Sequence, residues 1–261
     1  MRFTMKRILT GIAFVVCISS ATFATTPDTD VLFQTSTINA LLEGVYDGEV
    51  KCGELKHYGD FGIGTFQALD GEMIFVDGTI YQVKADGKVY NVADTVKTPF
   101  ASVTFFDTDV SYTLQKTTNF QQLCTYLDTL IPTKNIFYAF KIEGTFSCLK
   151  TRSVPAQKKP YPVLTEVTKN QPVFEFQNIQ GVIIGYRIPP FADKINVPGY
   201  HFHFLSSDKT VGGHLLEMET NKANIAIDYT HRFYLSLPEE NAFYTTDLST
   251  DKTKELEKAE K

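Results

Sequence analysis

Three Asp-Gly pairs at short intervals constrain the fold of this chain more than any other feature. They are Asp70-Gly71, Asp77-Gly78 and Asp86-Gly87. Short apolar runs, such as residues 73–76 and 80–83, separate the pairs. Asp-Gly is a preferred dipeptide of tight hairpin turns, because glycine adopts a positive φ without steric cost. The spacing therefore predicts an antiparallel β-meander, which residues 101–106 are expected to continue.

Two amphipathic helices are predicted outside the meander. Apolar residues at helical spacing predict a helix over residues 37–47, with Thr35 or Ser36 as its N-cap. The same spacing predicts a second helix over residues 120–131, which Pro132 would end because proline cannot continue the backbone hydrogen bonds.

Shorter segments complete the predicted fold. Further strands are expected at residues 136–142, 144–149, 173–176, 181–187, 225–229 and 233–237. Short helical segments are expected at residues 164–168 and 250–261. Strand-rich segments with a few helices are typical of the α+β class. We therefore predict an α+β fold with mixed or antiparallel sheets. A proline-rich stretch before residue 163 would divide it into subdomains of residues 25–162 and 163–261.

The N-terminal segment has the pattern of a secretory signal peptide. Basic Arg2, Lys6 and Arg7 precede an apolar stretch at residues 8–20, and small residues follow near Ala24. The apolar stretch is too short to span a bilayer comfortably. We expect residues 1–24 to be removed, so that the mature chain is exported, periplasmic or secreted, and not attached to a membrane.

Cysteine content and charge limit the remaining classes. Without Cys17 the chain keeps Cys52, Cys124 and Cys148, so at most one intramolecular disulfide can form. Whether Cys52 and Cys148 pair is left open. The net charge is −5, with no basic cluster that would indicate a nucleic-acid partner.

Histidines are concentrated in one segment, residues 199–214. His201 and His203 alternate with phenylalanine, which is the period of a strand with one imidazole face. A turn near Asp208-Lys209 would place His203 opposite His214, and opposed residues of an antiparallel pair share a face. Three imidazoles on one hairpin fit a zinc site with an open coordination position. Such a hairpin could belong to a cupin-like barrel or a carbonic-anhydrase-like sheet.

Several segments together resemble the α-acetolactate decarboxylase family over nearly the whole chain after the signal peptide. The first is the glycine-dense run at residues 59–66, whose glycines permit close approach of a ligand or strand. The others are residues 69–72, 98–101, 140–144, the segment around Arg152, and 185–187 before the histidine hairpin.

The resemblance implies a zinc enzyme that decarboxylates (S)-2-acetolactate to (R)-acetoin, usually as a homodimer of two-domain subunits. The metal ligands that this resemblance implies are His201, His203 and His214. The catalytic residues that it implies are Glu72, Arg152 and, in the C-terminal tail, Glu260. Thr65 could also line the pocket, whereas His57 and His231 are expected to be structural.

Two other functions remain open for this sequence. One is a different three-histidine zinc lyase or hydratase, and the other is a secreted, non-catalytic module that binds a metal or another ligand. In the second case Glu72 and Arg152 would be incidental to function.

Overall fold

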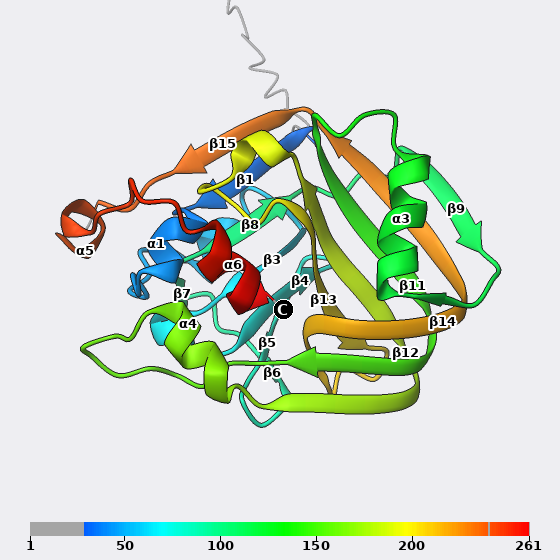
Figure 1. Ribbon diagram of the computed structural model, residues 1–261, viewed down its shortest axis with the longest axis horizontal. Helices are drawn as coiled ribbons and strands as arrows, with labels where there is room; N and C mark the ends of the chain where they lie inside the picture. Colours follow the sequence, from blue (N-terminus) through cyan, green and yellow to red (C-terminus); the bar gives the residue numbers. More distant parts are fainter. Residues whose placement is uncertain (1–28, 240, 261) are drawn as a thin grey trace, which may run out of the picture.

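The computed structural model describes residues 29–239 and 241–260, which form two β-sheets and a few helices. The first sheet has the strand order β15-β1-β8-β3-β4-β5-β6 (Figure 1). Its strands are β1 (Val31–Thr35), β3 (Phe61–Thr65), β4 (Glu72–Val76), β5 (Thr79–Val83), β6 (Val89–Asn91), β8 (Ala101–Thr104) and β15 (Arg232–Ser236). The α+β class predicted from the sequence is confirmed.

The predicted meander is present as β3, β4, β5 and β6, which pair antiparallel in chain order. Val76 pairs with Thr79 across the turn at Asp77-Gly78. Both turn residues have positive φ, 51° and 74°. This is the backbone conformation of a two-residue hairpin turn that matches the twist of its strands. Segment 101–106 enters the same sheet as β8, but on the far side of β3 rather than after β6.

Glycines in β3 allow the neighbouring strand to lie very close. A Cβ atom on Gly64 would lie 2.4 Å from the carbonyl oxygen of Phe100, and one on Gly62 would lie 2.3 Å from that of Ser102. The glycine-dense run thus serves the approach of β8 to β3, one of the two alternatives that its sequence permits.

The second sheet has the strand order β10-β14-β11-β12-β13, and β9 pairs with β14. Its strands are β9 (Val110–Leu114), β10 (Thr118–Asn119), β11 (Phe137–Arg152), β12 (Val173–Ile188), β13 (Gly199–Ser206) and β14 (Gly212–Thr230). Because β13 also pairs with β14, the strands from β11 to β14 close into a ring. A minor pair is formed by β2 (Val50–Lys51) and β7 (Lys97–Thr98).

Two pairs of predicted strands are single strands in the structure. Segments 136–142 and 144–149 are one continuous strand, β11, and segments 173–176 and 181–187 are one strand, β12. The prediction of separate strands was wrong because β11 has a neighbour on each side, and its register shifts near Gly144 absorb the irregularity without ending it.

Sheet membership crosses the expected subdomain boundary between residues 162 and 163. Strand β11 pairs with β12 and β14, and β15 pairs in parallel with β1. Each sheet therefore takes strands from both sides of that boundary. The division into two subdomains stays a prediction.

Helix α3 (Phe120–Leu130) agrees with the sequence, and Asn119 caps it in a capping box with Gln122. Helix α1 (Ile38–Leu42) is shorter than predicted, because Gly44 has a φ of 85° and ends it. Its N-cap is Thr37 rather than Thr35 or Ser36. The remaining helical segments are α2 (Cys52–Leu55), α4 (Leu164–Val167), α5 (Asn241–Thr245), α6 (Thr253–Glu260), η1 (Gln67–Leu69), η2 (Thr168–Asn170) and η3 (Pro190–Ala192).

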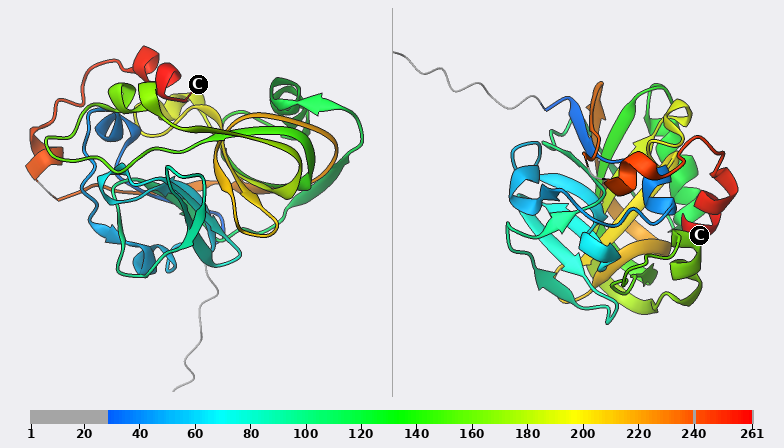
Figure 2. Two further views of the ribbon diagram at one scale, coloured as in Figure 1. Left: turned by 90° about the horizontal axis from the view of Figure 1, so that it is seen from below. Right: turned by 90° about the vertical axis from the view of Figure 1, so that its left-hand side faces the viewer.

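The core lies between the two sheets and inside the ring of the second. Tyr186 on β12 is buried, and its hydroxyl donates to the carbonyl oxygens of Phe61 and Ser102, 3.2 Å away in the first sheet. At one end of the molecule, α6 packs on α4 and α4 packs on α1 (Figures 1 and 2). These helices cover the end of the sheets where the histidine hairpin is located.

Some sequence predictions concern other parts of the molecule. The predicted signal peptide, residues 1–24, lies outside the described residues. Cys52, Cys124 and Cys148 are free thiols, and burial raises the pKa of Cys124 to about 12.

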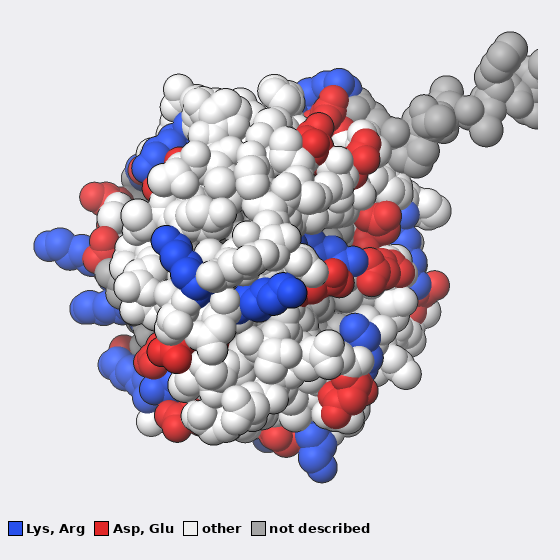
Figure 3. Space-filling model, turned by 90° about the vertical axis from the view of Figure 1, so that its right-hand side faces the viewer, with Lys and Arg blue, Asp and Glu red and all other residues white. Residues whose placement is uncertain are grey.

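Within the described residues, no helix is long and apolar enough to cross a membrane. On the face shown in Figure 3, positive and negative side chains are interspersed between wide uncharged areas.

Candidate metal centre and active site

The histidine hairpin has the predicted register. His203 on β13 pairs with His214 on β14, and His201 lies two residues earlier on the same face of β13. The strands turn at residues 207–211, where Lys209 has a φ of 58°. The sequence prediction of a shared imidazole face is therefore confirmed.

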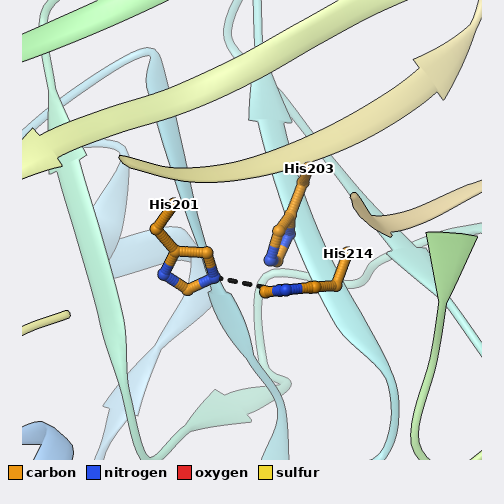
Figure 4. A group of neighbouring side chains, drawn as sticks. All are labelled: His201, His203 and His214. Carbon is orange, nitrogen blue, oxygen red and sulfur yellow. Dashed lines mark hydrogen bonds between the residues drawn. The ribbon is translucent and has the colours of Figure 1, made fainter. Parts of the chain in front are cut away.

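The three imidazoles point toward one another (Figure 4). One nitrogen from each ring lies within 4.8 Å of the nitrogens offered by the other two. Nε2 of His201 is 3.1 Å from Nδ1 of His214. Two nitrogens bound to one tetrahedral zinc at about 2.0–2.1 Å lie about 3.3 Å apart, so this spacing suits a shared ion.

A second contact fixes the ring of His203. Its Nδ1 donates to the carbonyl oxygen of Met73 on β4, 2.8 Å away, and this bond assigns the proton to Nδ1. Nε2 of the same ring is buried and has no hydrogen-bond partner among the described residues. A buried lone pair without a partner is costly unless a ligand uses it, so the residues fit a metal ion.

The surroundings of the cluster keep its imidazoles neutral. Burial, and then the charge of Arg152, lower the pKa of His201 to about 3. Burial is also the main reason that the pKa values of His203 and His214 lie well below the ordinary range. Neutral imidazole is the form that binds metal.

Glu72 and Arg152 lie beside the cluster and contact each other. Oε1 of Glu72 is 3.4 Å from Nη1 of Arg152, and Oε2 is 3.6 Å from Nε2 of His203. Burial raises the pKa of Glu72 to about 7, against the opposing effect of Arg152. Nη2 of Arg152 donates to the carbonyl oxygen of Ala259, whereas Nε is buried without a partner among the described residues.

The C-terminal helix brings Glu260 to the same place. Its Oε2 is 3.6 Å from Nε2 of His201 and 3.8 Å from Nε2 of His214. Burial raises the pKa of this carboxyl. Thr65 borders the same space as these residues, and its hydroxyl donates to the carbonyl oxygen of Gly71. His57 and His231 are exposed and lie outside the three-histidine group.

Two cavities meet at this cluster. The inner chamber is about 40 Å³ in volume and is lined by the histidines, Glu72, Arg152 and Glu260. The outer cleft is about 540 Å³ in volume. His201, His214 and Glu260 border both. Arrangements of this kind, with convergent polar groups beside a cleft of several hundred Å³, are typical of small-molecule sites.

Residues 32–250 match the sequence profile of the alpha-acetolactate decarboxylase family. The chain belongs to this family. It is 47% identical over 232 residues to the alpha-acetolactate decarboxylase of Methanosarcina mazei, with 89% of this chain and 81% of that protein covered. It is 45% identical over 229 residues to that of Methylococcus capsulatus, with 88% of each covered. The crystal structure of alpha-acetolactate decarboxylase from Bacillus subtilis strain 168 superposes with a TM-score of 0.86 at 35% identity, covering 88% of this chain and 98% of that one.

In this alpha-acetolactate decarboxylase family member, the site residues predicted from the sequence lie together in the structure. They are His201, His203, His214, Glu72, Arg152 and Glu260. The structure also shows participants that sequence reasoning missed, namely the carbonyl groups of Met73 and Ala259. Backbone carbonyls carry no residue-type signal, so no sequence pattern could have identified them. Apolar walls of the chamber, such as Ile38 and Phe100, were also missed because they read as ordinary core residues.

Proposed function

We propose that this protein is a zinc-dependent decarboxylase that converts (S)-2-acetolactate to (R)-acetoin and carbon dioxide. The observation that carries the proposal is the convergence of Glu72, Arg152 and Glu260 on the three-histidine cluster in a chain of the alpha-acetolactate decarboxylase family. The protein of that name from Methanosarcina mazei shares 47% identity with this chain over 89% of its length.

The chemistry requires a place for negative charge. When the carboxylate leaves as carbon dioxide, the electron pair of the broken C–C bond moves to the neighbouring ketone and gives an enediolate. His201, His203 and His214 would hold the zinc ion, and neutral imidazoles leave it its full charge. When bound, zinc would supply Lewis-acid stabilisation of the developing negative charge.

Arg152 is suited to orienting the substrate. Its guanidinium stays charged at any physiological pH and presents donors in a fixed plane. Glu72 and the carbonyl of Ala259 hold Nη1 and Nη2, so the side chain cannot rotate freely. Nε of Arg152 is buried and has no partner among the described residues, so it would be able to donate a hydrogen bond to an oxygen of the substrate.

Glu72 is suited to moving a proton. The carbon that loses carbon dioxide must gain a proton to give acetoin, and a carboxyl with a pKa of about 7 can hold that proton near neutral pH. Arg152 is a poor donor because its pKa is above about 12. Glu260, which lies beside His201 and His214, would limit the free space around the reacting atoms.

We also propose that the mature chain is exported and acts as a homodimer. The N-terminal sequence supports export, through its basic residues and the apolar stretch that follows. Cell fractionation tests export, and light scattering of the purified protein tests the dimer.

Acetoin formation from racemic acetolactate tests the main proposal. The protein should form (R)-acetoin from half of the racemate, lose activity after chelation and regain it with zinc. Zinc-loaded protein that forms no acetoin would contradict the proposal. Turnover of another keto acid would then favour a different three-histidine lyase or hydratase, and stoichiometric zinc without turnover would favour a binding module.

A further inference from the structure

Helix α6 lies at the boundary between the inner chamber and the outer cleft. Its residues Thr253, Leu256, Glu257 and Glu260 line the cleft, and Glu260 also lines the chamber. Figures 1 and 2 show α6 at the surface of the molecule, next to α4. The helix therefore forms part of the boundary between the cleft and the inner chamber, which His201 and His214 also border.

The inner chamber is too small to hold a keto acid. Its volume is about 40 Å³. Because one water molecule takes roughly 10–15 Å³ of free volume, the chamber has room for a few waters only. The cleft, at about 540 Å³, lies within the range of roughly 300–1,000 Å³ typical of ligand pockets. A substrate that fits the cleft cannot reach the buried faces of Glu72 and Arg152 while α6 keeps this position.

Several polar contacts hold the C-terminal segment to the rest of the chain before α6 begins. The amide of Asn39 donates to the carbonyl oxygens of Leu248 and Thr250, each at 3.5 Å. Lys194 donates to the carbonyl oxygen of Ser249, and Lys252 forms an ion pair of 2.5 Å with Glu43, the C-cap residue of α1.

The helix itself is attached more lightly. Leu256 and Ala259 are its buried side chains, and both belong to the apolar cluster that includes Ile38 and Leu164. Its backbone meets the site through the bond from Arg152 to the carbonyl oxygen of Ala259 and through a hydrogen bond between His214 and the backbone of Glu260. A short helix held by few buried groups opens at a low free-energy cost.

We propose that α6 is a lid over the active site, anchored by the Glu43–Lys252 pair. It moves outward to admit the keto acid from the cleft and returns to place Glu260 and the Ala259 carbonyl in the site. Lys252 and Glu43 are positioning residues, because they act on the site through α6. This inference rests on the proposed decarboxylase function for the identity of the substrate, but the opening of α6 can be measured without turnover.

A thiol placed under the lid reports its opening. Ala259→Cys puts a small thiol at a fully buried position, and Lys258→Cys puts one at an exposed position of the same helix. Modification by N-ethylmaleimide is followed by mass spectrometry of the C-terminal peptide, which separates it from the native thiols of the chain. The thiol at residue 259 should react at least roughly tenfold more slowly than that at residue 258, since it requires opening.

The rate at saturating reagent gives the decisive comparison. Under that condition the modification rate of Ala259→Cys equals the opening rate of α6. If substrate enters through this opening, the rate cannot be lower than kcat of the same variant. A limiting rate below kcat would overturn the proposal, as would a thiol at residue 259 that reacts as fast as the one at 258. Absence of acetoin formation by the unmodified enzyme would instead contradict the proposed function and leave the opening rate measurable.

The anchor is tested by removing its charges. Lys252→Met and Glu43→Gln, each added to Ala259→Cys, should accelerate modification about two- to fivefold, the effect of losing a partly exposed ion pair. Lys254→Met removes an exposed positive charge from the same helix and should leave the rate unchanged. Equal modification rates in all three charge variants would show that the Glu43–Lys252 pair does not anchor α6. Hydrogen exchange of residues 253–260 in the same charge variants without the added cysteine gives a second readout, should Ala259→Cys fail to fold.

Discussion

Oε1 of Glu72 lies 3.4 Å from Nη1 of Arg152, and this ion pair joins the first residue of β4 to the last residue of β11. Both side chains are almost fully buried, with 8% and 5% of their surface exposed. The pair therefore connects the two sheets at the candidate active site. Losing one partner of a buried pair leaves a buried charge without compensation, which costs about 3–5 kcal/mol.

This relationship predicts a strong coupling between the two residues. Arg152→Met should lower the free energy of unfolding by about 2–4 kcal/mol, somewhat less than a fixed charge would cost because Glu72 can take up a proton. Adding Glu72→Gln should recover part of that loss without restoring acetoin formation. Urea unfolding of both single variants and the double variant measures the coupling, and additive effects would contradict it.

Glu72→Gln alone separates chemistry from metal binding. Gln keeps the shape of the side chain but cannot exchange a proton, so kcat should fall by about 10²–10⁴-fold, as for loss of a general acid or base. Metal content should stay at the wild-type level. Glu143→Gln, an exposed change on β11, is the matched control. Undiminished turnover in Glu72→Gln would exclude Glu72 from proton transfer.

His201→Ala should remove metal and activity together. The cluster loses one of its three nitrogens, and the remaining pair cannot complete a tetrahedral site. Metal analysis after dialysis against a weak chelator should show at least roughly tenfold lower zinc occupancy. His231→Ala, at an exposed position away from the cluster, should retain both properties. Normal zinc content in His201→Ala would show that this residue is not a ligand.

A buried aspartate outside the active site predicts how stability depends on pH. Asp228 on β14 is 1% exposed, and burial together with nearby Asp109, Asp107 and Asp30 raises its pKa from 3.8 to about 8. Between these values the folded chain keeps a proton that the unfolded chain has released. The stabilising contribution is therefore complete below about pH 4 and is lost as the pH rises toward 8.

Asp228→Asn should flatten this dependence, because the amide does not titrate and can still accept the hydrogen bond from the backbone N–H of Asp107. Urea unfolding at several pH values between 5 and 8 measures the slope, which for one proton is at most about 1.4 kcal/mol per pH unit. The same slope in wild type and variant would assign the dependence to other groups.

Asn119→Ala tests the capping box of α3. The side chain of Asn119 accepts from the backbone N–H of Gln122, and the side chain of Gln122 accepts from that of Asn119. Losing the cap should cost about 1 kcal/mol of unfolding free energy. Gln121→Ala, exposed in the same turn, should change stability much less. Thermal unfolding of both variants checks this, and equal effects would argue against the cap.

Local features of the fold could be predicted from the sequence, because short-range geometry decides them. The turn at Asp77-Gly78 and the pairing of His203 with His214 depend on strand alternation and turn chemistry within a few residues. The length of α1 depended on a single backbone angle at Gly44, which an amphipathic pattern over residues 37–47 cannot show. The continuity of β11 through Gly144 depended on neighbours on both sides, distant in sequence.

The remainder of the site required tertiary structure or a family resemblance. Glu72, Arg152 and Glu260 are separated by 80 residues or more and are joined through contacts between sheets and the C-terminal helix. Taken alone, Glu260 is one charge in a charged tail, with Glu255 and Glu257 nearby. Its place beside His201 follows from the docking of Leu256 and Ala259, which the tail sequence signals only weakly.

The hydrogen bond from His203 to the carbonyl of Met73 makes the three-histidine cluster part of the contact between the two sheets. An ion that binds only the folded arrangement stabilises it by an amount that grows with the free ion concentration. Zinc supply would then govern how long the protein survives as well as how fast it works. Under the proposed zinc dependence, zinc-starved cultures would contain less of it, because chains without the ion would unfold more often and be degraded.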